Sequence, residues 1–349
     1  MLRIGIIGCG RVSSKHINAI NNSKYELISI CDINESRLSK YKSLKKVKTY
    51  SNYNSMILAE KLDVISILTD SGSHEKIIND ISGKVKNIIV EKPFTLTTSG
   101  AKRIINKCNK DLSRVFVVHQ NRLNKTVQKL FELKSQNKLG KIFLISVNLY
   151  WSRSEEYYKS DLWRGKWKTD GGVIANQGIH YIDIIQQLLG DPNTIFAEGN
   201  TAMNHIETED TASINFKYKD GCIVNFQLTT GIRPKNMEGS ISIFSDKGSL
   251  QIGGLALNEI KDINIIDLKL EGSLNTEIKD LYGQGHQIFY NELYDKITQN
   301  LNSQFEGKNL VNLIRLINAI YTSIERSSKI YFDSNKNYKT KLGIYESSI

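Results

Sequence analysis

The sequence predicts an α/β protein with a doubly wound parallel sheet at its N-terminus, followed by a second α/β domain with a large open, mostly antiparallel sheet. Two patterns support this prediction. Over the first 121 residues, short apolar runs alternate with helical stretches, as in parallel sheets with helices on both faces. Farther along, runs of alternating apolar and polar residues are separated by turn signals, which is typical of antiparallel strands with one polar face. A chain of 349 residues suggests about two domains, which we place at 1–121 and 122–349.

The first domain begins with a continuous apolar run over 2–7, which predicts a strand buried on both faces. A helix is expected over 11–21 because Val12, Ile17 and Ile20 recur at helical spacing. The remaining strands of this sheet are predicted at 27–31, 63–68, 87–90 and 115–118.

The second domain is predicted to open with a helix over 124–135 and a long strand over 141–151. A late helix over 309–326 carries a stripe of apolar residues, so we expect it to pack against the rest of the protein. The residues after this helix are polar and are expected to be loosely ordered. Further strands are predicted at 211–218, 222–230, 240–244 and 263–270.

The composition is that of an ordinary soluble globular protein, with 40% hydrophobic and 24% charged residues. There is no apolar stretch of about 18 residues, as a transmembrane helix would need, and the first residues lack a signal-peptide pattern. We therefore expect a cytoplasmic protein with no membrane partner. Cys9, Cys31, Cys108 and Cys222 lack metal-site spacing, so we expect free thiols and no metal site.

The formal net charge is +11, a balance that suits either nucleic acid or small anionic ligands. The lysines are scattered along the chain, and the nearest approach to a run is at 42–48. Nucleic-acid-binding proteins usually cluster their basic residues on one face or element. The pattern therefore favours a solvated basic surface over nucleic-acid binding, and such a surface would still attract a small anionic ligand.

A glycine-rich turn joins the first strand to the first helix, which is the context required of a dinucleotide-binding fingerprint. Gly8 permits the tight turn, and Gly10 lets the backbone approach a pyrophosphate without a Cβ in the way. Ser13 replaces the usual third glycine and is still small enough for close helix packing. Asp32 ends the second strand, where a carboxylate binds the adenosine ribose hydroxyls, although a turn-initiating aspartate is the alternative. No arginine follows Asp32 directly, so these residues predict a Rossmann domain that binds NAD rather than NADP.

The loop over 69–74 follows the third predicted strand and should lie at the carboxyl edge of the sheet, where ligands bind in doubly wound folds. We expect this loop to contact the nicotinamide ribose, although His74 is interpreted equally well as a helix-start residue. The residues expected to contact NAD are Gly8, Gly10, Arg11, Val12, Asp32, Thr69, Ser71, His74, Glu91, Lys92 and Gln120.

The segment Glu91-Lys92-Pro93 ends the fourth strand and is expected at the same edge. When an alcohol is oxidised, a lysine ammonium beside the oxygen stabilises the developing negative charge. A histidine, with an ordinary pKa of about 6.5, accepts the proton at neutral pH. His180 is the candidate base, with Asn176 one helical turn before it and Asp183 positioned to orient its imidazole. Alone, Lys92 would be interpreted as a surface residue and His180 as a core histidine; together they predict a dehydrogenase in which both groups reach one hydroxyl.

Three motifs resemble the glucose–fructose oxidoreductase/inositol dehydrogenase/rhizopine-catabolism (Gfo/Idh/MocA) family: Gly8-Cys9-Gly10, Glu91-Lys92-Pro93 and Gly171-Gly172 followed by Asn176 and His180. The resemblance covers nearly the whole chain. It implies a Rossmann domain followed by an α/β domain whose open sheet often packs face to face, so a homo-oligomer, either a dimer or a tetramer, is expected. It also implies that Lys92 and His180 are catalytic and that Asp32 binds the cofactor.

The chain departs from many family members at Asn176, where they have aspartate. Asparagine cannot take a proton, so the base must be His180, with or without help from Lys92. The segment Asn176-Gln177-Gly178-Ile179-His180 is similar to one subgroup, the dehydrogenases of UDP-N-acetylglucosaminuronic acid (UDP-GlcNAcA). Asn124-Lys125 stands where that subgroup has Asn-Pro, which weakens a helix-start signal but not the chemistry. Further matches to the subgroup lie at 120–122, 151–153, 157–158, 163–165, 253–258 and 285–286.

The subgroup resemblance implies NAD-dependent oxidation of the sugar C3 hydroxyl to a 3-keto nucleotide-sugar in surface polysaccharide (lipopolysaccharide O-antigen) biosynthesis, with an aminotransferase acting next. Arginine suits carboxylate and pyrophosphate oxygens, and Arg153, Arg164 and Arg233 lie in predicted loops. Tyr157 and Tyr158 are candidates to stack on uracil or sugar, and a solvated or packed side chain is the alternative for each. The residues expected to contact substrate are Lys92, Arg153, Tyr157, Asn176, Gln177, His180 and Arg233.

Three other functions stay open on sequence grounds. Another dehydrogenase or ketoreductase of the family would act on inositol or a different sugar, a reading that Asn176 and the tryptophan–arginine segments disfavour. An NAD-dependent glycosidase would oxidise its substrate transiently and release free sugar without net NADH. A non-catalytic NAD-sensing protein is disfavoured by the presence of both Lys92 and His180.

Overall fold

The computed structural model describes residues 1–41, 44, 46–268, 274–277 and 283–344, which form two compact units. No helix in these ranges is both long and apolar enough to span a bilayer. Unit 1 comprises Met1–Thr95, Ser99–Gln120 and Gln284–Val311, and unit 2 comprises Leu96–Thr98, Asn121–Gly283 and Asn312–Ile349. The domain boundary expected after residue 121 stays a prediction, to which the contacts add that the late segment Gln284–Val311 packs with unit 1.

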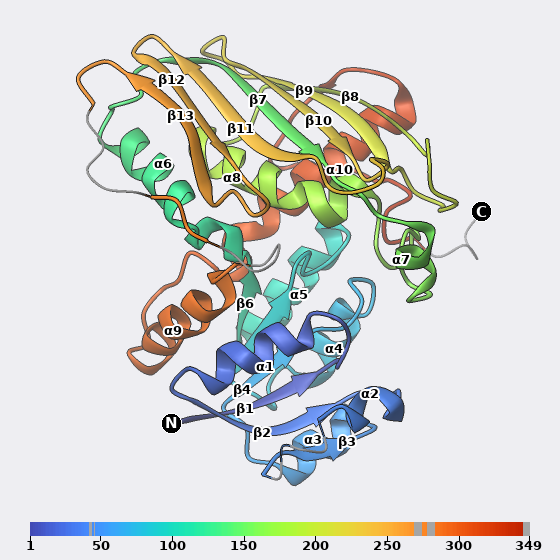
Figure 1. Ribbon diagram of the computed structural model, residues 1–349. Helices are drawn as coiled ribbons and strands as arrows, with labels where there is room; N and C mark the ends of the chain where they lie inside the picture. Colours follow the sequence, from blue (N-terminus) through green and yellow to red (C-terminus); the bar gives the residue numbers. More distant parts are fainter. Residues whose placement is uncertain (42–43, 45, 269–273, 278–282, 345–349) are drawn as a thin grey trace. The chain divides into compact units, whose positions relative to one another are not determined.

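Unit 1 is built on a six-stranded, wholly parallel sheet with the order β3-β2-β1-β4-β5-β6 (Figure 1). The doubly wound Rossmann architecture predicted from the sequence is therefore confirmed. The strands are β1 (Leu2–Ile7), β2 (Tyr25–Cys31), β3 (Lys48–Tyr50), β4 (Val64–Ile67), β5 (Asn87–Glu91) and β6 (Arg114–Val118). The helices are α1 (Ser13–Asn21), α2 (Glu35–Ser39), α3 (Tyr53–Ala59), α4 (His74–Ile81), α5 (Thr98–Lys110) and α9 (Gly285–Thr298), with the 3-10 turn η3 (Gly307–Leu310). The 3-10 turn η1 (Gln120–Leu123) begins at the last residue of this segment and continues into unit 2.

The order of the strands determines where a ligand can bind in unit 1. The chain builds outward from β1 to β3 and then returns to β4 on the other side of β1. In such sheets the carboxyl ends of the two strands that flank this reversal border the ligand crevice. The central strands are buried on both faces, and for that reason their apolar runs were predictable. The sequence analysis missed β3 because Lys48 and Thr49 are exposed, so the strand has no apolar run.

Unit 2 contains an eight-stranded sheet with the order β13-β12-β11-β7-β10-β9-β8-β14. All its pairs are antiparallel except β7 with β10, which confirms the mostly antiparallel sheet predicted. The strands are β7 (Ile142–Tyr150), β8 (Thr194–Asn200), β9 (Thr211–Lys217), β10 (Ile223–Thr229), β11 (Glu238–Ser245), β12 (Gly248–Gly253), β13 (Glu259–Ile265) and β14 (Ile330–Tyr331). The helices are α6 (Lys125–Ser135), α7 (Glu155–Lys159), the π turn η2 (Ile174–Gly178), α8 (Ile179–Leu189) and α10 (Val311–Arg326).

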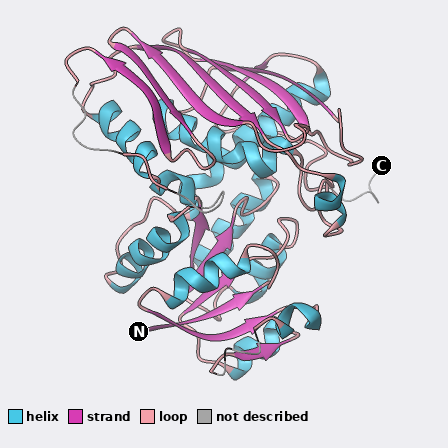
Figure 2. Cartoon of the chain, viewed as in Figure 1, coloured by secondary structure: helices cyan, strands magenta, loops and turns pink. Residues whose placement is uncertain are grey.

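One face of the unit 2 sheet is covered by helices (Figure 2). Figure 1 shows α6, α8 and α10 along that face. The core between them is made of the alternate residues that each strand turns inward, such as Ile214 and Phe216 on β9 and Phe226 on β10. The rings of Phe216 and Phe226 pack edge to face with their centroids 5.0 Å apart.

Two predictions for unit 2 need correction. The strands β8 and β12 were not predicted, because in each a run of three or fewer apolar residues is broken by glycine or polar residues. The residues after α10 are not loosely ordered up to 344, because Tyr338 and Leu342 are buried and Tyr338 stacks on Phe332. The strand predicted at 263–270 begins earlier, at Glu259, and ends at Ile265; its predicted end lies outside the described residues.

Gly8→Ala is expected to destabilise unit 1 strongly. Gly8 has a φ of +98°, and a Cβ there would lie 2.7 Å from the carbonyl carbon of Leu68, where β1 and β4 come together. Gly221 is a matched control, since its φ is +94° but an added Cβ would meet nothing within 4 Å in the described part of the chain. Gly221→Ala should therefore show only the backbone cost of about 1–2 kcal/mol. Thermal unfolding followed by circular dichroism should show the larger loss for Gly8→Ala, and equal losses would contradict the close approach of the strands.

Candidate functional site

The glycine turn of unit 1 has an open side at Gly10. A Cβ added there would meet, among the described residues, only Arg37 Nη1, at 3.9 Å. The turn is closed on the helix side by Ser13, which is buried and donates a 2.6 Å hydrogen bond from Oγ to the Gly10 carbonyl oxygen. A backbone that is bare on one side and leads into a helix N-terminus suits an approaching pyrophosphate.

Asp32 lies directly beside this turn. Its Oδ2 accepts a 2.7 Å hydrogen bond from the Cys9 N–H, and its Oδ1 accepts a 2.8 Å hydrogen bond from the Asn34 N–H. Each carboxylate oxygen has a second lone pair, so the group can still accept from ribose hydroxyls. Arg37 Nη1 lies 3.9 Å from Asp32 Oδ2. Arg37 was not among the predicted site residues, and its only signal in the sequence is its position five residues after Asp32.

His74 connects two of the predicted loops of unit 1. It is the first residue of α4, and its ring is buried. Its Nδ1 lies 2.9 Å from the Pro93 carbonyl oxygen, and its Nε2 lies 3.2 Å from the Thr69 carbonyl oxygen. Burial lowers the pKa of His74, so a neutral ring donates to one carbonyl only, and the shorter contact favours Pro93. The structure thus brings 69–74 and 91–93 together, while a contact of His74 with NAD stays a prediction.

Lys92 follows directly after β5 and is half-buried. Its backbone N–H donates a 3.1 Å hydrogen bond to Glu91 Oε2. Glu91 is itself buried, and its Oε1 lies 2.9 Å from His16 Nε2 and 3.5 Å from His286 Nε2. Neither histidine was among the predicted site residues. These contacts give the Glu91 carboxylate a supporting role beside Lys92, and the expected contact of Glu91 with NAD stays a prediction.

The remaining predicted NAD contacts of unit 1 differ in exposure. Arg11 is exposed, and Val12 is half-buried just before α1. Ser71 and Gln120 are buried. Gln120 is packed against Gly285, where an added Cβ would lie 2.7 Å from the Gln120 carbonyl oxygen. The two motif positions at 120 and 285, far apart in sequence, therefore meet.

In unit 2, Asn176 and Gln177 lie in the π turn η2, and His180 is the second residue of α8. The sequence analysis expected an ordinary helical turn here. A π turn takes one extra residue per turn and occurs often at functional sites. Asn176 is half-buried, whereas Gln177 and His180 are buried.

Asn176 is held by a carboxylate that the sequence analysis did not consider. Its Nδ2 donates a 2.6 Å hydrogen bond to Asp170 Oδ1. The other oxygen of Asp170 accepts a 2.7 Å hydrogen bond from the Gly165 N–H. Asp170 is 2% exposed, so this arrangement fixes the orientation of the Asn176 amide, with its Nδ2 toward Asp170.

Asp183, the residue expected to orient His180, is paired with a buried cation. Arg122 donates from Nε to Asp183 Oδ2 at 2.7 Å and from Nη2 to Asp183 Oδ1 at 2.5 Å. The two side chains are 1% and 2% exposed. A bidentate pair of this kind fixes the carboxylate in one plane, and its contact with the imidazole of His180 stays a prediction.

Glu209 supports the Gly171-Gly172 turn that leads into η2. Its Oε1 accepts hydrogen bonds from the Ile174 N–H (3.0 Å) and from the Tyr321 hydroxyl (2.9 Å). A Cβ on Gly172 would lie 2.3 Å from the Glu209 carboxyl carbon, so only glycine fits. Burial raises the pKa of Glu209 to about 7. Nothing in the sequence around Glu209 signalled this role.

Two of the predicted arginines enclose an aromatic ring. The guanidinium carbon of Arg164 lies 4.4 Å from the Tyr157 ring centroid, and that of Arg153 lies 5.3 Å from it. Arg164 also donates a 2.7 Å hydrogen bond from Nη1 to the Tyr157 hydroxyl. These cation–π contacts hold Arg153, Tyr157 and Arg164 as one cluster beside Trp151 and α7. Because Tyr157 already contacts two cations, an anionic group is a better ligand for the cluster than a bare base.

Arg233 is exposed, and its Nη1 shares an acceptor with Arg153, because it and the Arg153 backbone N–H both donate to the Thr230 carbonyl oxygen, at 3.3 and 2.9 Å. Its Nη2 donates a 3.0 Å hydrogen bond to Asn204 Oδ1, and its Nη1 donates a 2.9 Å hydrogen bond to the carbonyl oxygen of Ile232. Arg153 thus contacts the Tyr157 ring, whereas the guanidinium of Arg233 is held by Asn204 and by backbone carbonyl oxygens.

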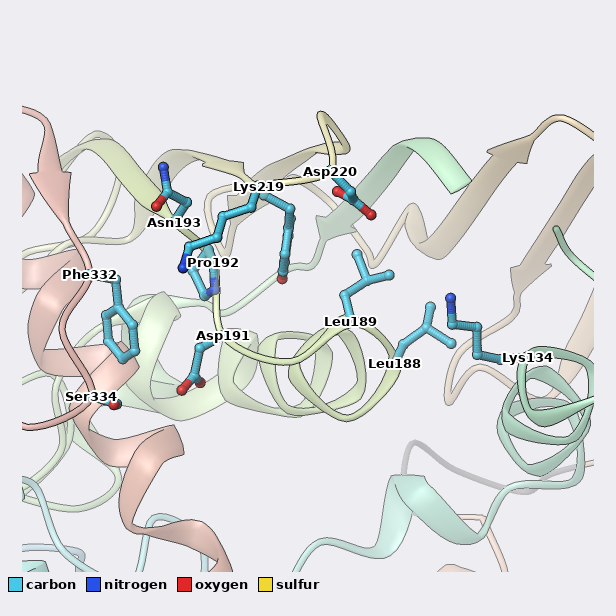
Figure 3. A pocket seen from close by; sticks show the side chains of 11 residues that line it. Lys134, Leu188, Leu189, Asp191, Pro192, Asn193, Lys219, Asp220, Phe332 and Ser334 are labelled. Atoms are coloured by element: carbon cyan, nitrogen blue, oxygen red, sulfur yellow. The ribbon is translucent and has the colours of Figure 1, made fainter. Parts of the chain in front are cut away.

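A separate surface pocket of unit 2 lies at the C-terminal end of α8, and its wall includes Lys134, Asp191, Lys219 and Phe332 (Figure 3). It contains none of the residues in which the sequence analysis expects chemistry. We therefore do not consider it part of the candidate site.

Two family models match the chain. Residues 2–119 match an oxidoreductase family with an NAD-binding Rossmann fold, and residues 127–251 match the GFO/IDH/MocA C-terminal domain. The chain belongs to the Gfo/Idh/MocA family. It is an oxidoreductase that uses NAD, as the glycine turn and Asp32 predicted.

Within this family, similar structures include the WlbA dehydrogenase from Bordetella pertussis, solved in complex with NADH and UDP-GlcNAcA. It matches with a TM-score of 0.87 and 29% identity, over 95% of this chain and 99% of that chain. The WlbA dehydrogenase from Chromobacterium violaceum, with the same two ligands, matches with a TM-score of 0.87 and 29% identity, over 95% of this chain and 96% of that chain.

Curated relatives in the family are more distant. Glucose-6-phosphate 3-dehydrogenase from Bacillus subtilis is 25% identical over 321 residues, which is 88% of this chain and 91% of that protein. D-apiose dehydrogenase from Paraburkholderia graminis is 25% identical over 222 residues, or 62% of this chain, and myo-inositol 2-dehydrogenase from Thermotoga maritima is 23% identical over 229 residues, or 64% of this chain. The chain spans only 57% and 66% of the length of these last two proteins.

The raised pKa of Glu209 predicts that unit 2 loses stability as pH rises. The pKa of the carboxyl is about 7 in the folded protein and about 4.5 in the unfolded chain. Between these two pH values, the folded state therefore binds more protons than the unfolded state. The free energy of unfolding should therefore fall over this window, by roughly 2–4 kcal/mol, and Glu209→Gln should flatten the slope.

Urea unfolding at several pH values, followed by tryptophan fluorescence, measures this directly, because Trp151, Trp163 and Trp167 all lie in unit 2. Glu198→Gln, which alters an exposed carboxylate on β8, is the control. An unchanged slope in Glu209→Gln would show that Glu209 does not titrate in this range.

Proposed function

We propose that the protein catalyses the NAD-dependent oxidation of the C3 hydroxyl of UDP-GlcNAcA to the 3-keto nucleotide-sugar. The observation that carries this proposal is the likeness, over 95% of the chain and at 29% identity, to two dehydrogenases solved with NADH and UDP-GlcNAcA. The coarser conclusion, an NAD-dependent oxidoreductase of the Gfo/Idh/MocA family, does not depend on it.

Lys92 and His180 have different tasks in this proposal. The Lys92 ammonium stabilises the negative charge that develops on the sugar oxygen. The His180 imidazole accepts the hydroxyl proton. Asn176 cannot accept a proton, and with its Nδ2 bound to Asp170 it presents its carbonyl oxygen as a hydrogen-bond acceptor for a sugar hydroxyl.

The residues of the glycine turn fit a bound NAD. Gly10 leaves the backbone open to the pyrophosphate, the N-terminus of α1 carries the partial positive charge of the helix dipole, and Asp32 accepts from the adenosine ribose. When bound, NAD supplies the hydride acceptor. The further residues that we propose to contact it are Arg11, Val12, Thr69, Ser71, His74, Lys92 and Gln120.

For the substrate, we propose that the cluster of Arg153, Tyr157 and Arg164 binds the anionic groups of a nucleotide-sugar. Guanidinium groups pair well with carboxylate and diphosphate oxygens, and two of them stand on one ring here. Gln177 and Arg233 complete the set of proposed substrate contacts together with Lys92, Asn176 and His180.

A second candidate is the oxidation of a sugar phosphate at C3. The observation that favours it is the match to glucose-6-phosphate 3-dehydrogenase over 88% of this chain. Both candidates are anionic hexoses, so the arginine cluster suits either one. We rank UDP-GlcNAcA first because the identity to the WlbA dehydrogenases is higher, 29% against 25%.

The biological setting follows as part of the same proposal. A 3-keto sugar is the substrate that an aminotransferase needs, so we propose such an enzyme downstream, in surface polysaccharide (lipopolysaccharide O-antigen) synthesis in the cytoplasm. We further propose a homo-oligomer, a dimer or a tetramer, formed through the sheet of unit 2.

Lys92→Ala and His180→Ala are each expected to lower kcat at least a hundredfold, the usual effect of losing an acid–base or charge-stabilising group, without weakening NAD binding. Turnover is measured as NADH absorbance with UDP-GlcNAcA, glucose 6-phosphate and myo-inositol, each with and without 2-oxoglutarate as a reoxidant. The exposed residues Lys84 and His205 provide matched controls, Lys84→Ala and His205→Ala. A clear response to inositol with none to UDP-GlcNAcA would refute the assigned substrate.

Gly10→Ala is expected to weaken NAD binding about tenfold or more and to leave the melting temperature unchanged. The reason is that the added methyl group meets no close protein atom among the described residues but enters the space that the pyrophosphate needs. Calorimetric titration with NADH gives the dissociation constant. An unaltered constant would place the pyrophosphate elsewhere.

A further inference from the structure

Unit 1 contains a buried cluster of polar side chains to which the proposed chemistry assigns no role. Helix α9 packs against α1 and brings Tyr290 and His286 next to His16, whose partner Tyr290 is 274 residues away in the sequence. The rings of His16 and His286 stand edge to face with their centroids 4.7 Å apart. His16 and Tyr290 are 0% exposed and His286 is 4% exposed, so the cluster is sealed from solvent.

Hydrogen bonds connect these side chains in a series that begins at Ser66 and ends at Glu91. Ser66 Oγ lies 2.9 Å from the Tyr290 hydroxyl, the Tyr290 hydroxyl lies 2.8 Å from His16 Nδ1, and His16 Nε2 lies 2.9 Å from Glu91 Oε1. The series thus runs from β4 through α9 and α1 to the end of β5.

The protonation state of Glu91 determines which atom donates in each hydrogen bond of this series. Burial by itself raises the pKa of Glu91, but the contacts with His16 and His286 outweigh it and hold the pKa well below its usual range, so the carboxylate only accepts. His16 Nε2 therefore donates. Burial lowers the pKa of His16 to about 4, so its ring is neutral and Nδ1 must accept from Tyr290, which in turn accepts from Ser66.

The other oxygen of Glu91 connects the series to the proposed site. Glu91 Oε2 accepts the hydrogen bond from the backbone N–H of Lys92, at 3.1 Å. A carboxylate whose first oxygen is fixed by His16 presents its second oxygen in one direction, and the peptide of Lys92 is held against it. The position of the Lys92 backbone therefore depends on His16 and Tyr290, which act on it only through Glu91.

His16, Glu91 and His286 also offer the donor set of a metal site. Two ligands of a tetrahedral zinc ion, at bonds of about 2.0–2.2 Å, stand about 3.3–3.5 Å apart. His16 Nε2 and Glu91 Oε1 are 2.9 Å apart, which is the length of an N–H···O hydrogen bond. The other nitrogen of His16 is hydrogen-bonded to Tyr290. The distances therefore fit a hydrogen bond between His16 Nε2 and Glu91 Oε1 better than a zinc ion between them.

We propose that Ser66, Tyr290, His16 and Glu91 form a buried positioning relay, whose one-directional hydrogen bonds hold the backbone at Lys92 in the geometry needed for hydride transfer. The proposal rests on the proposed catalytic role of Lys92. His16 and Tyr290 are then positioning residues, and the late helix α9 contributes to catalysis without touching substrate.

The test removes one hydroxyl from the middle of the relay. In Tyr290→Phe, His16 Nδ1 loses the hydroxyl that donates to it. The ring keeps its Nε2–H on Glu91 but is no longer held from its other side, so the Glu91 carboxylate and the Lys92 peptide are less firmly positioned. The expected result is a fall in kcat of about tenfold, the rate equivalent of one hydrogen bond, with the NADH dissociation constant unchanged. Tyr25→Phe is the matched control. The Tyr25 ring packs on Tyr290 with the centroids 5.6 Å apart, but within the described residues its hydroxyl makes no hydrogen bond to the relay, so its kcat should equal that of the wild type.

A double variant separates positioning from mere stability. Tyr290→Phe leaves the buried Ser66 hydroxyl without its acceptor, and adding Ser66→Ala removes that hydroxyl, so part of the lost melting temperature should return. The relay remains cut, so kcat should stay low. A kcat that recovers together with the melting temperature would show a purely structural role and overturn the proposal.

Further outcomes distinguish failure of the relay from failure of the proposed role of Lys92. A wild-type kcat in Tyr290→Phe, or an NADH dissociation constant that worsens together with kcat, overturns the relay. An active Lys92→Ala variant instead refutes the catalytic role of Lys92 itself, so the two failures are distinguishable. If Tyr290→Phe does not fold, Ser66→Ala alone cuts the relay at its far end, and a kcat equal to that of the wild type would overturn the proposal.

Discussion

An ionised carboxylate inside a protein must be surrounded by hydrogen-bond donors or cations, because burying it unpaired costs several kcal/mol. This constraint shapes the surroundings of the proposed chemistry in both units. Asp32 attracts the Cys9 N–H and so fixes the glycine turn, and Glu91 does the same for the N–H of Lys92. In unit 2, Asp183 is compensated by Arg122 and Asp170 by an amide and a backbone N–H. The backbone at Cys9, Lys92 and Gly165 is thus oriented by carboxylates to which the proposed chemistry gives no direct part.

Much of the fold and part of the site were predictable because their signals are local. A buried parallel strand needs a continuous apolar run, and Gly8 stands where two strands touch, so residue type and position are linked by sterics alone. The ends of β1, β2, β4 and β5 gather at one edge of the sheet as a matter of topology. For this reason, Asp32 and Lys92 could be selected from their places in the sequence.

What escaped prediction depends on contacts across long stretches of chain. Tyr290 and His16 have no common pattern in the sequence, and Glu209 meets Gly172 only once the chain has folded. The π turn around Asn176 has the same spacing of residue types as an ordinary helix, so periodicity could not reveal it. The short strand β3 has no apolar run because its residues face water.

The packing of α9 onto α1 has a consequence for the order in which the protein is made. A ribosome that has produced the first 283 residues has already delivered the whole parallel sheet and nearly all of the large antiparallel one. At that stage Tyr290, the hydrogen-bond partner of His16, has not yet been synthesised. The nucleotide-binding unit, although it comes first in the sequence, can be completed only after most of its neighbour has emerged, so the two units mature together rather than one after the other.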